Sequence, residues 1–262
     1  MYNSVNAEIK KIVSNKTIVL IYLIYLFVLS YLYRESLNPI FKHNFPGYFP
    51  SLFLYSLTLF GIIIFIIIGT FTISIDYNSN MIGTCFFCYK KNQLLIAKLV
   101  AILIINTLIV IITYLFGIFL SLLSKDNFIF LPLSKQILQI ITIIVICTFW
   151  SFTALLLTII TKNTALSIVF LFLLSFFEPV LYNKIEVIMI KKYFLVFNQM
   201  GILKHFFSNL GYGGIIIIPD YNYNSLLFSL FMFFLYFAIE IVIMLLYIKQ
   251  NERLYILGHN YN

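Results

Sequence analysis

Long apolar runs dominate the chain and constrain its fold more than any other feature. A helix needs roughly 20 mostly apolar residues to cross the hydrocarbon core of a bilayer. The runs that meet this need are 17–33, 52–75, 94–123, 136–160, 164–182 and 226–248. The sequence therefore predicts an all-α integral membrane protein, with six transmembrane helices in one domain that covers 1–262.

The composition agrees with a membrane location. Hydrophobic residues make up 62% of the chain and charged residues only 10%, and the mean hydropathy is +1.03. A water-soluble chain of this size would be left with much more apolar surface than one core can hide. No small-residue cleavage site follows the first run, so we expect it to be a retained anchor and not a signal peptide.

Basic residues near the ends of the spans favour one orientation. With the N-terminus inside, the cytoplasmic side receives Lys10, Lys11, Lys16, Lys90, Lys91, Lys98, Lys162, Lys249 and Arg253. The excess is slight in number and clearer in position, and it predicts that both termini are cytoplasmic. The net charge of +8 suits anionic lipid head groups. The basic residues form no stripe, so we expect no nucleic acid partner.

The first residues have the pattern of an interfacial helix. Val5, Ile9 and Ile12 recur at helical spacing, with Glu8 early and Lys10 and Lys11 later, which is the order that the helix dipole favours. We expect 1–16 to form an amphipathic helix in the cytoplasmic interface. The alternative is a frayed tail.

Patterns of catalytic or metal-binding residues are absent from the sequence. The chain has no phosphate-binding loop and no His-Glu-x-x-His motif. Cys85 and Cys88 have the spacing of a zinc or redox site, but no second pair completes it. They are expected to pack at a helix face, with a cytoplasmic thiol switch as the alternative. The sequence thus predicts no catalytic residue, no metal and no cofactor bound by this chain.

The region before the last span carries a regular polar pattern. Lys184, Lys191, Asn198 and His205 recur every seven residues in an apolar setting, and Glu178 precedes a proline where the fifth span is expected to end. We expect 183–225 to form an outer loop with amphipathic helices in the outer leaflet. Its polar residues Glu178, Lys191, Asn198 and His205 are candidates for an outer gate, and an interfacial anchor is the alternative.

One charged residue lies deep within a predicted span. Glu240 is more than halfway along the last run, and a carboxylate in hydrocarbon must be paired, protonated or in contact with water. Asn106 in the third span and Lys98 at its start are the expected partners. The two interpretations are a transport or coupling role and a structural hydrogen-bonded site.

A short polar segment separates the second and third spans. It contains Asp76 and Tyr77, then Gly83 and Thr84, a hydrophobic cluster, and Lys90 and Lys91, with Lys98 in the following span. This order resembles the segment between the second and third spans in permease subunits of the ABC-2 type exporter family, particularly the small lantibiotic-immunity and bacitracin-resistance permeases. The resemblance extends in outline over the whole chain and at residue level covers about 76–98.

The resemblance implies a function and a set of partners. The segment would be a coupling helix that docks on a separate ATPase subunit. The docking residues would be Asp76, Tyr77, Gly83, Thr84, Phe86, Phe87, Lys90, Lys91 and Lys98. Two ATPase subunits would supply ATP and magnesium, and a second permease subunit, identical or different, would complete the pore.

The resemblance also implies a cargo and a location. The cargo would be amphipathic, peptide-like or lipid-like, such as an antimicrobial peptide handled for export or self-immunity, and the location would be a bacterial plasma membrane. The alternative is a six-span substrate-binding, scaffold or immunity protein without ATP coupling. An ATPase gene beside this one would favour export.

Overall fold

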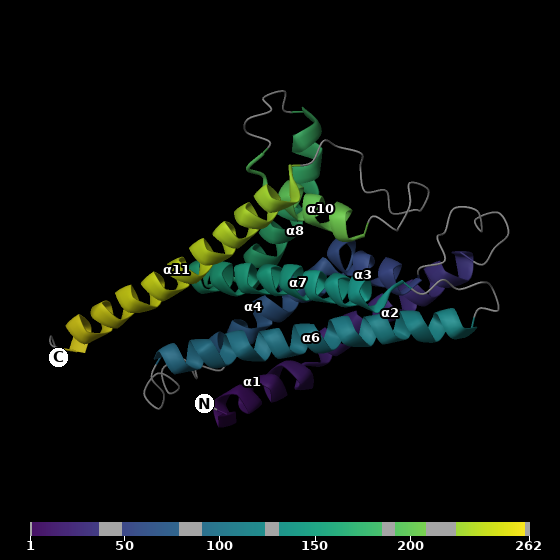
Figure 1. Cartoon of the computed structure of the whole chain (residues 1–262). Helices are drawn as coiled ribbons and strands as arrows, with labels where there is room; N and C mark the ends of the chain where they lie inside the picture. Colours follow the sequence, from purple (N-terminus) through teal and green to yellow (C-terminus); the bar gives the residue numbers. More distant parts are fainter. Residues whose placement is uncertain are drawn as a thin grey trace.

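The computed structural model describes residues 2–36, 49–78, 91–123, 131–184, 192–207 and 224–259 (Figure 1). These ranges contain nine helices and no strand. The helices are α1 (Tyr2–Ser14), α2 (Lys16–Ser36), α3 (Phe49–Leu59), α4 (Ile62–Asn78), α6 (Lys91–Leu123), α7 (Leu133–Thr161), α8 (Thr164–Lys184), α10 (Leu195–Phe206) and α11 (Leu226–His259). The predicted all-α class is confirmed for this part of the chain.

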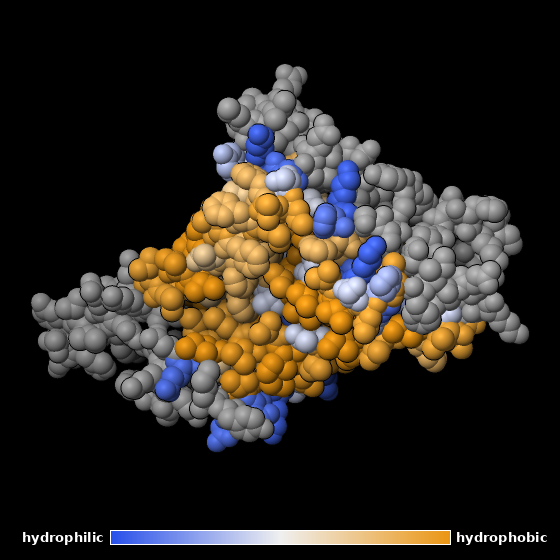
Figure 2. Space-filling model, in the orientation of Figure 1, coloured by the Kyte–Doolittle hydropathy of each residue, from blue (hydrophilic) through white to orange (hydrophobic). Residues whose placement is uncertain are grey.

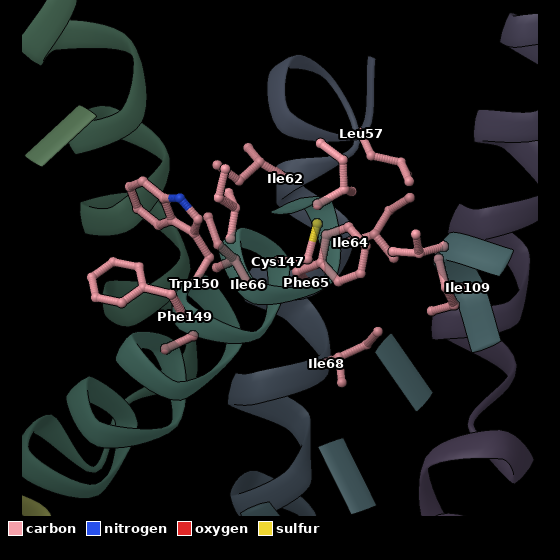
Figure 3. Packing of buried hydrophobic residues seen from close by; sticks show 14 of the residues in the cluster. Leu57, Ile62, Ile64, Phe65, Ile66, Ile68, Ile109, Cys147, Phe149 and Trp150 are labelled. Atoms are coloured by element: carbon pink, nitrogen blue, oxygen red, sulfur yellow. The ribbon is translucent and has the colours of Figure 1, made fainter. Parts of the chain in front are cut away.

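Two helices, α4 and α7, form the centre of the bundle. Nearly every residue of α4 from Ile62 to Ser74 is buried, as expected for a helix that is apolar on all sides. Figure 3 shows Phe65 of α4 beside Cys147 of α7, and Phe65, Cys147 and Trp150 are all buried. The two helices approach closely at Gly69, where an added Cβ atom would lie 2.0 Å from the Ser151 carbonyl oxygen. Glycine is therefore required at the central helix contact.

The number of membrane spans in the structure can be compared with the six that the sequence predicts. In the described ranges, three helices are long and apolar enough to cross a membrane, and up to five spans result if each of two bent helix pairs counts as one. These five overlap the predicted runs other than 164–182, and the first bent pair also includes Asn3–Ser14, which was predicted to lie in the interface. Within 164–182, the apolar stretch Thr164–Glu178, which is part of α8, is shorter than a span, so the sixth span is not confirmed.

The second predicted span is broken in the middle. Helices α3 and α4 meet at Phe60 and Gly61 with a bend of 55°. The Ser56 carbonyl accepts from the N–H groups of both Phe60 and Gly61, at 2.9 and 3.1 Å. A Cβ atom at position 61 would come within 2.9 Å of Leu57, so glycine allows the bend.

Helices α7 and α8 are joined by only two residues, Lys162 and Asn163. Lys162 has a φ of 54° and ends α7. The Asn163 side-chain oxygen accepts from the Leu166 N–H at 3.1 Å and caps α8. The expected end of the helix at Glu178 is wrong, because α8 continues to Lys184. A proline keeps a helical φ, so its missing N–H removes one hydrogen bond without ending this helix.

Helix α1 turns sharply into α2, with a bend of 60°. One face of α1, with Ser4, Glu8 and Ile12, is buried against the bundle, while Lys10 and Val13 are exposed. Residues 2–14 are therefore helical and not a frayed tail, while their place in a membrane interface stays a prediction. Figure 1 shows both chain ends toward the same end of the bundle. Figure 2 shows a broad apolar surface with hydrophilic residues near two opposite margins.

Candidate functional site

A buried ion pair joins three helices at the end of the bundle where α1 lies. The Lys98 Nζ donates to the Glu8 carboxylate at 2.9 Å and to the Thr72 carbonyl oxygen at 2.9 Å. Lys11, three residues after Glu8 on α1, also contacts it, with 2.9 Å between the Lys11 Nζ and Glu8 Oε1. Glu8 is 2% exposed and Lys98 3% exposed. We call Glu8, Lys11, Lys98 and Thr72 the α1 latch, because they fix α1 to α4 and α6.

Lys98, one of the predicted docking residues, is part of the α1 latch. Its ammonium is withdrawn into the bundle, where Glu8 neutralises its charge, so the side chain is not presented on the surface. Lys98 is also no partner of Glu240 in this structure. Burial of the charge is tolerated because the ammonium has an ionic partner and a carbonyl acceptor.

The other predicted docking residues lie at or beyond the ends of the described helices. Asp76 and Tyr77 belong to the last turn of α4, and Lys91 is the first residue of α6. Gly83, Thr84, Phe86, Phe87 and Lys90 lie outside the described residues, as do Cys85 and Cys88. The docking surface therefore stays a prediction, although its two flanking helices are tied together by the latch.

Asn106 forms a second polar site inside the bundle. Its Nδ2 donates to the Ser151 hydroxyl at 3.0 Å, and that hydroxyl donates to the Phe65 carbonyl oxygen at 2.9 Å. Asn106 is fully buried, and its Oδ1 has no hydrogen-bond partner among the described residues. The site links α6, α7 and α4, and it does not include Glu240.

Glu240 lies on α11 and meets α7 instead. The Thr153 hydroxyl donates to its Oε1, while the other carboxyl oxygen, Oε2, has no partner within the described ranges. The same hydroxyl also lies 2.9 Å from the Phe149 carbonyl oxygen. A hydroxyl has one hydrogen to share between these acceptors, so Glu240 is incompletely satisfied. The expected pairing with Asn106 or Lys98 is wrong.

Glu178 of α8 binds the backbone at the start of α10. Its Oε1 accepts from the backbone N–H groups of Val196 and Phe197, at 2.5 and 3.1 Å. These N–H groups belong to the second and third residues of α10, so a carboxylate of α8 caps another helix. A negative charge at a helix N-terminus is also favoured by the helix dipole.

The regular polar pattern of the outer region does not form one exposed stripe. Asn198 is fully buried, and its Nδ2 donates to the Lys192 and Phe194 carbonyl oxygens at 2.9 and 2.8 Å. His205 is exposed at the far end of α10, and Lys191 lies outside the described residues. Of the described gate candidates, Glu178 contacts the backbone of Val196 and Phe197 beside the buried Asn198, while His205 lies at the far end of α10. The outer gate stays a prediction.

Sequence reasoning missed the residues that hold α10 in place. The Trp150 indole donates to Gln199 at 2.9 Å, and the Gln139 amide donates to the Phe206 carbonyl oxygen at 3.0 Å. Gln139 and Gln199 are each 1% exposed. Their signal was a long amide side chain in an apolar run, since such a group needs a partner when buried.

No metal centre emerges from the described part of the chain, which holds no cluster of three or more His, Cys, Asp or Glu side chains. Comparisons of the chain with protein-family models, with curated proteins and with solved structures gave no match. The class that the structure itself defines is a helical protein with several helices suited to a membrane.

Proposed function

We propose that this chain is the permease subunit of an ATP-driven exporter of the ABC-2 type. The observation that supports the proposal is the α1 latch. It holds α1 against the end of α4 and the start of α6, and these are the two helices on either side of the 79–90 segment. A segment that docks on an ATPase would need such a rigid mounting to transmit force.

The path of that force follows from the packing. Movement of an ATPase cleft would displace the 79–90 segment and, with it, the ends of α4 and α6. Helix α4 lies at the centre of the bundle and meets α7 at Gly69 without space between them. Displacement of α4 would therefore move α7, because closely packed helices cannot slide independently.

The remaining parts of the proposal are the partners and the cargo. Two ATPase subunits would bind ATP and magnesium, and this chain would perform no chemical step itself. A second permease subunit would complete a path for an amphipathic, peptide-like or lipid-like cargo across a bacterial plasma membrane, with both termini of this chain in the cytoplasm.

Co-expression and co-purification with a cognate ATPase test the proposal. Asp76→Ala, Tyr77→Ala and the double change Lys90→Glu/Lys91→Glu should weaken the complex, since charged contacts at a cleft support association. Lys135→Glu is the matched control, because Lys135 is an exposed lysine near the start of α7. A complex that tolerates all the segment changes would refute docking through 76–91. A chain that binds its target without energy coupling would retain no ATPase at all.

A further inference from the structure

The contact between α7 and α11 combines a carboxylate with a group of aromatic rings. The Phe149 ring lies 4.9 Å from Phe233 and 6.1 Å from Phe237, and Phe152 lies 5.6 Å from Phe237 between ring centroids. Glu240 follows Phe237 by three residues on α11, so the two side chains share a face of the helix. We call Glu240, Thr153 and these four rings the α7/α11 seam.

The carboxylate of the seam lacks a counter-charge. Glu240 is 9% exposed, and one of its oxygens has no hydrogen-bond partner in the described ranges. The ion pairs found there, Lys11 with Glu8 and Lys98 with Glu8, both lie in the α1 latch. An ionised carboxylate without a cation is costly in hydrocarbon, so a cation bound at the seam would stabilise the charged form of Glu240 over the protonated form.

The seam is also reached from the lipid side. Of the three long apolar helices, α11 is the least buried, with 22% of its apolar window inside the protein against 50% for α6 and 61% for α7. Next to Glu240, Ile239 is 45% exposed and Val242 53% exposed. A molecule dissolved in the bilayer would meet α11 first and would enter by parting it from α7.

We propose that the α7/α11 seam binds a lipophilic organic cation, with Glu240 as the counter-ion and the rings of Phe152 and Phe237 as the wall. Aromatic faces attract a cation that lies within about 6 Å of the ring centroid. A hard metal ion would need several oxygen ligands, and the seam offers a carboxylate and one hydroxyl. This inference narrows the cargo of the proposed permease to lipophilic cations. Transport of such a cation rests on the proposed function, whereas binding of the cation does not.

Binding of tetraphenylphosphonium to the purified full chain tests the proposal. The chain is placed in nanodiscs of zwitterionic lipid, and bound cation is measured by equilibrium dialysis against empty nanodiscs. Tetraphenylborate has the same shape and the opposite charge, so it should not bind. Glu240→Gln should weaken cation binding at least about tenfold, the loss typical of a charge-assisted contact.

Two phenylalanine variants test the wall of the seam. Phe237→Leu keeps apolar bulk and removes the ring, and it should weaken binding by about two- to thirtyfold. Phe231→Leu is the control, since Phe231 lies on the same helix and is 63% exposed; it should bind as the unchanged chain does. Monodisperse chromatography of each variant verifies its fold, and Phe237→Leu carries the test if Glu240→Gln fails to fold.

The outcomes separate this inference from the proposed function. Equal binding by the Glu240→Gln chain, equal binding of tetraphenylborate, or no binding above empty nanodiscs would each overturn the seam as a cation site. The ATPase is absent from the measurement, so these results would leave the docking proposal intact. Failure to capture an ATPase would overturn the permease proposal while Glu240-dependent binding still stood.

Discussion

Removal of one partner from the α1 latch should destabilise the protein unequally, depending on which charge is left behind. Glu8→Leu takes the carboxylate away from two ammonium groups, those of Lys98 and Lys11, which both lie 2.9 Å from it. Breaking a buried pair in this way costs about 3–5 kcal/mol. Lys98→Met leaves Glu8 with Lys11 at 2.9 Å, so the remaining charge still has a partner and the loss should be about 1–2 kcal/mol.

The double variant Glu8→Leu/Lys98→Met removes both charges and should recover most of the loss. Replacement of a whole buried pair by apolar side chains is often close to neutral. The double variant should therefore be about 3 kcal/mol more stable than the sum of the single effects predicts. Lys10→Met is the matched control, because Lys10 is exposed on the same helix; it should change stability by no more than about 0.5 kcal/mol.

The assay can use the one tryptophan of the chain. Trp150 is fully buried and donates to Gln199, so its fluorescence reports the unfolding of the bundle during a denaturing-detergent titration in mixed micelles. Equal losses for Glu8→Leu and Lys98→Met, or a double variant whose loss equals their sum, would show that the buried charges do not interact as the structure indicates.

Other contacts predict further outcomes. Gly69→Ala should lower the free energy of unfolding by about 1–3 kcal/mol, which is more than Gly117→Ala should. The added Cβ atom would lie 2.0 Å from the Ser151 carbonyl oxygen at position 69, but 3.0 Å from the Pro50 Cα atom at position 117. The same titration measures both variants, and a larger loss for Gly117→Ala would contradict the packing. Glu178→Ala should remove about 1–2 kcal/mol of capping and speed hydrogen exchange at Val196 and Phe197, whereas unchanged exchange would show that the cap is dispensable. Cysteines placed at 39–48 or 209–222 should react with an external thiol reagent and those at 78–92 or 250–260 should not; a reversed pattern would reverse the predicted orientation.

The apolar runs were sufficient to locate the long helices, but not the places where helices break. Helices α6 and α7 follow the predicted 94–123 and 136–160 closely, because apolar length is a property of the local sequence. The break at Phe60 and Gly61 lies inside an equally apolar run. It depends on two N–H groups sharing the Ser56 carbonyl, and hydropathy carries no signal for that arrangement.

Polar residues within the spans were recognised, while their partners were not. Glu240 was found because its charge is unusual in hydrocarbon, yet its partner Thr153 lies 87 residues away. Likewise Lys98 meets Glu8 across 90 residues. A single sequence shows that a polar group within a span needs a hydrogen-bond partner, but it does not show which helix supplies that partner, since the pairing depends on tertiary packing.

The contacts of α7 give that packing its order. Along this one helix, Gln139 and Trp150 hold α10, Ser151 joins Asn106 of α6 to the Phe65 carbonyl of α4, and Thr153 meets Glu240 of α11. The bonds of Trp150, Ser151 and Thr153 leave the helix in different directions, because successive residues are separated by 100° around an α-helix. Helix α7 therefore fixes the rotation and depth of four neighbours at once. A movement that reaches α7 through Gly69 would be passed to both α10 and α11. Helix α7 would thus connect the α1 latch, through α4, to the α7/α11 seam.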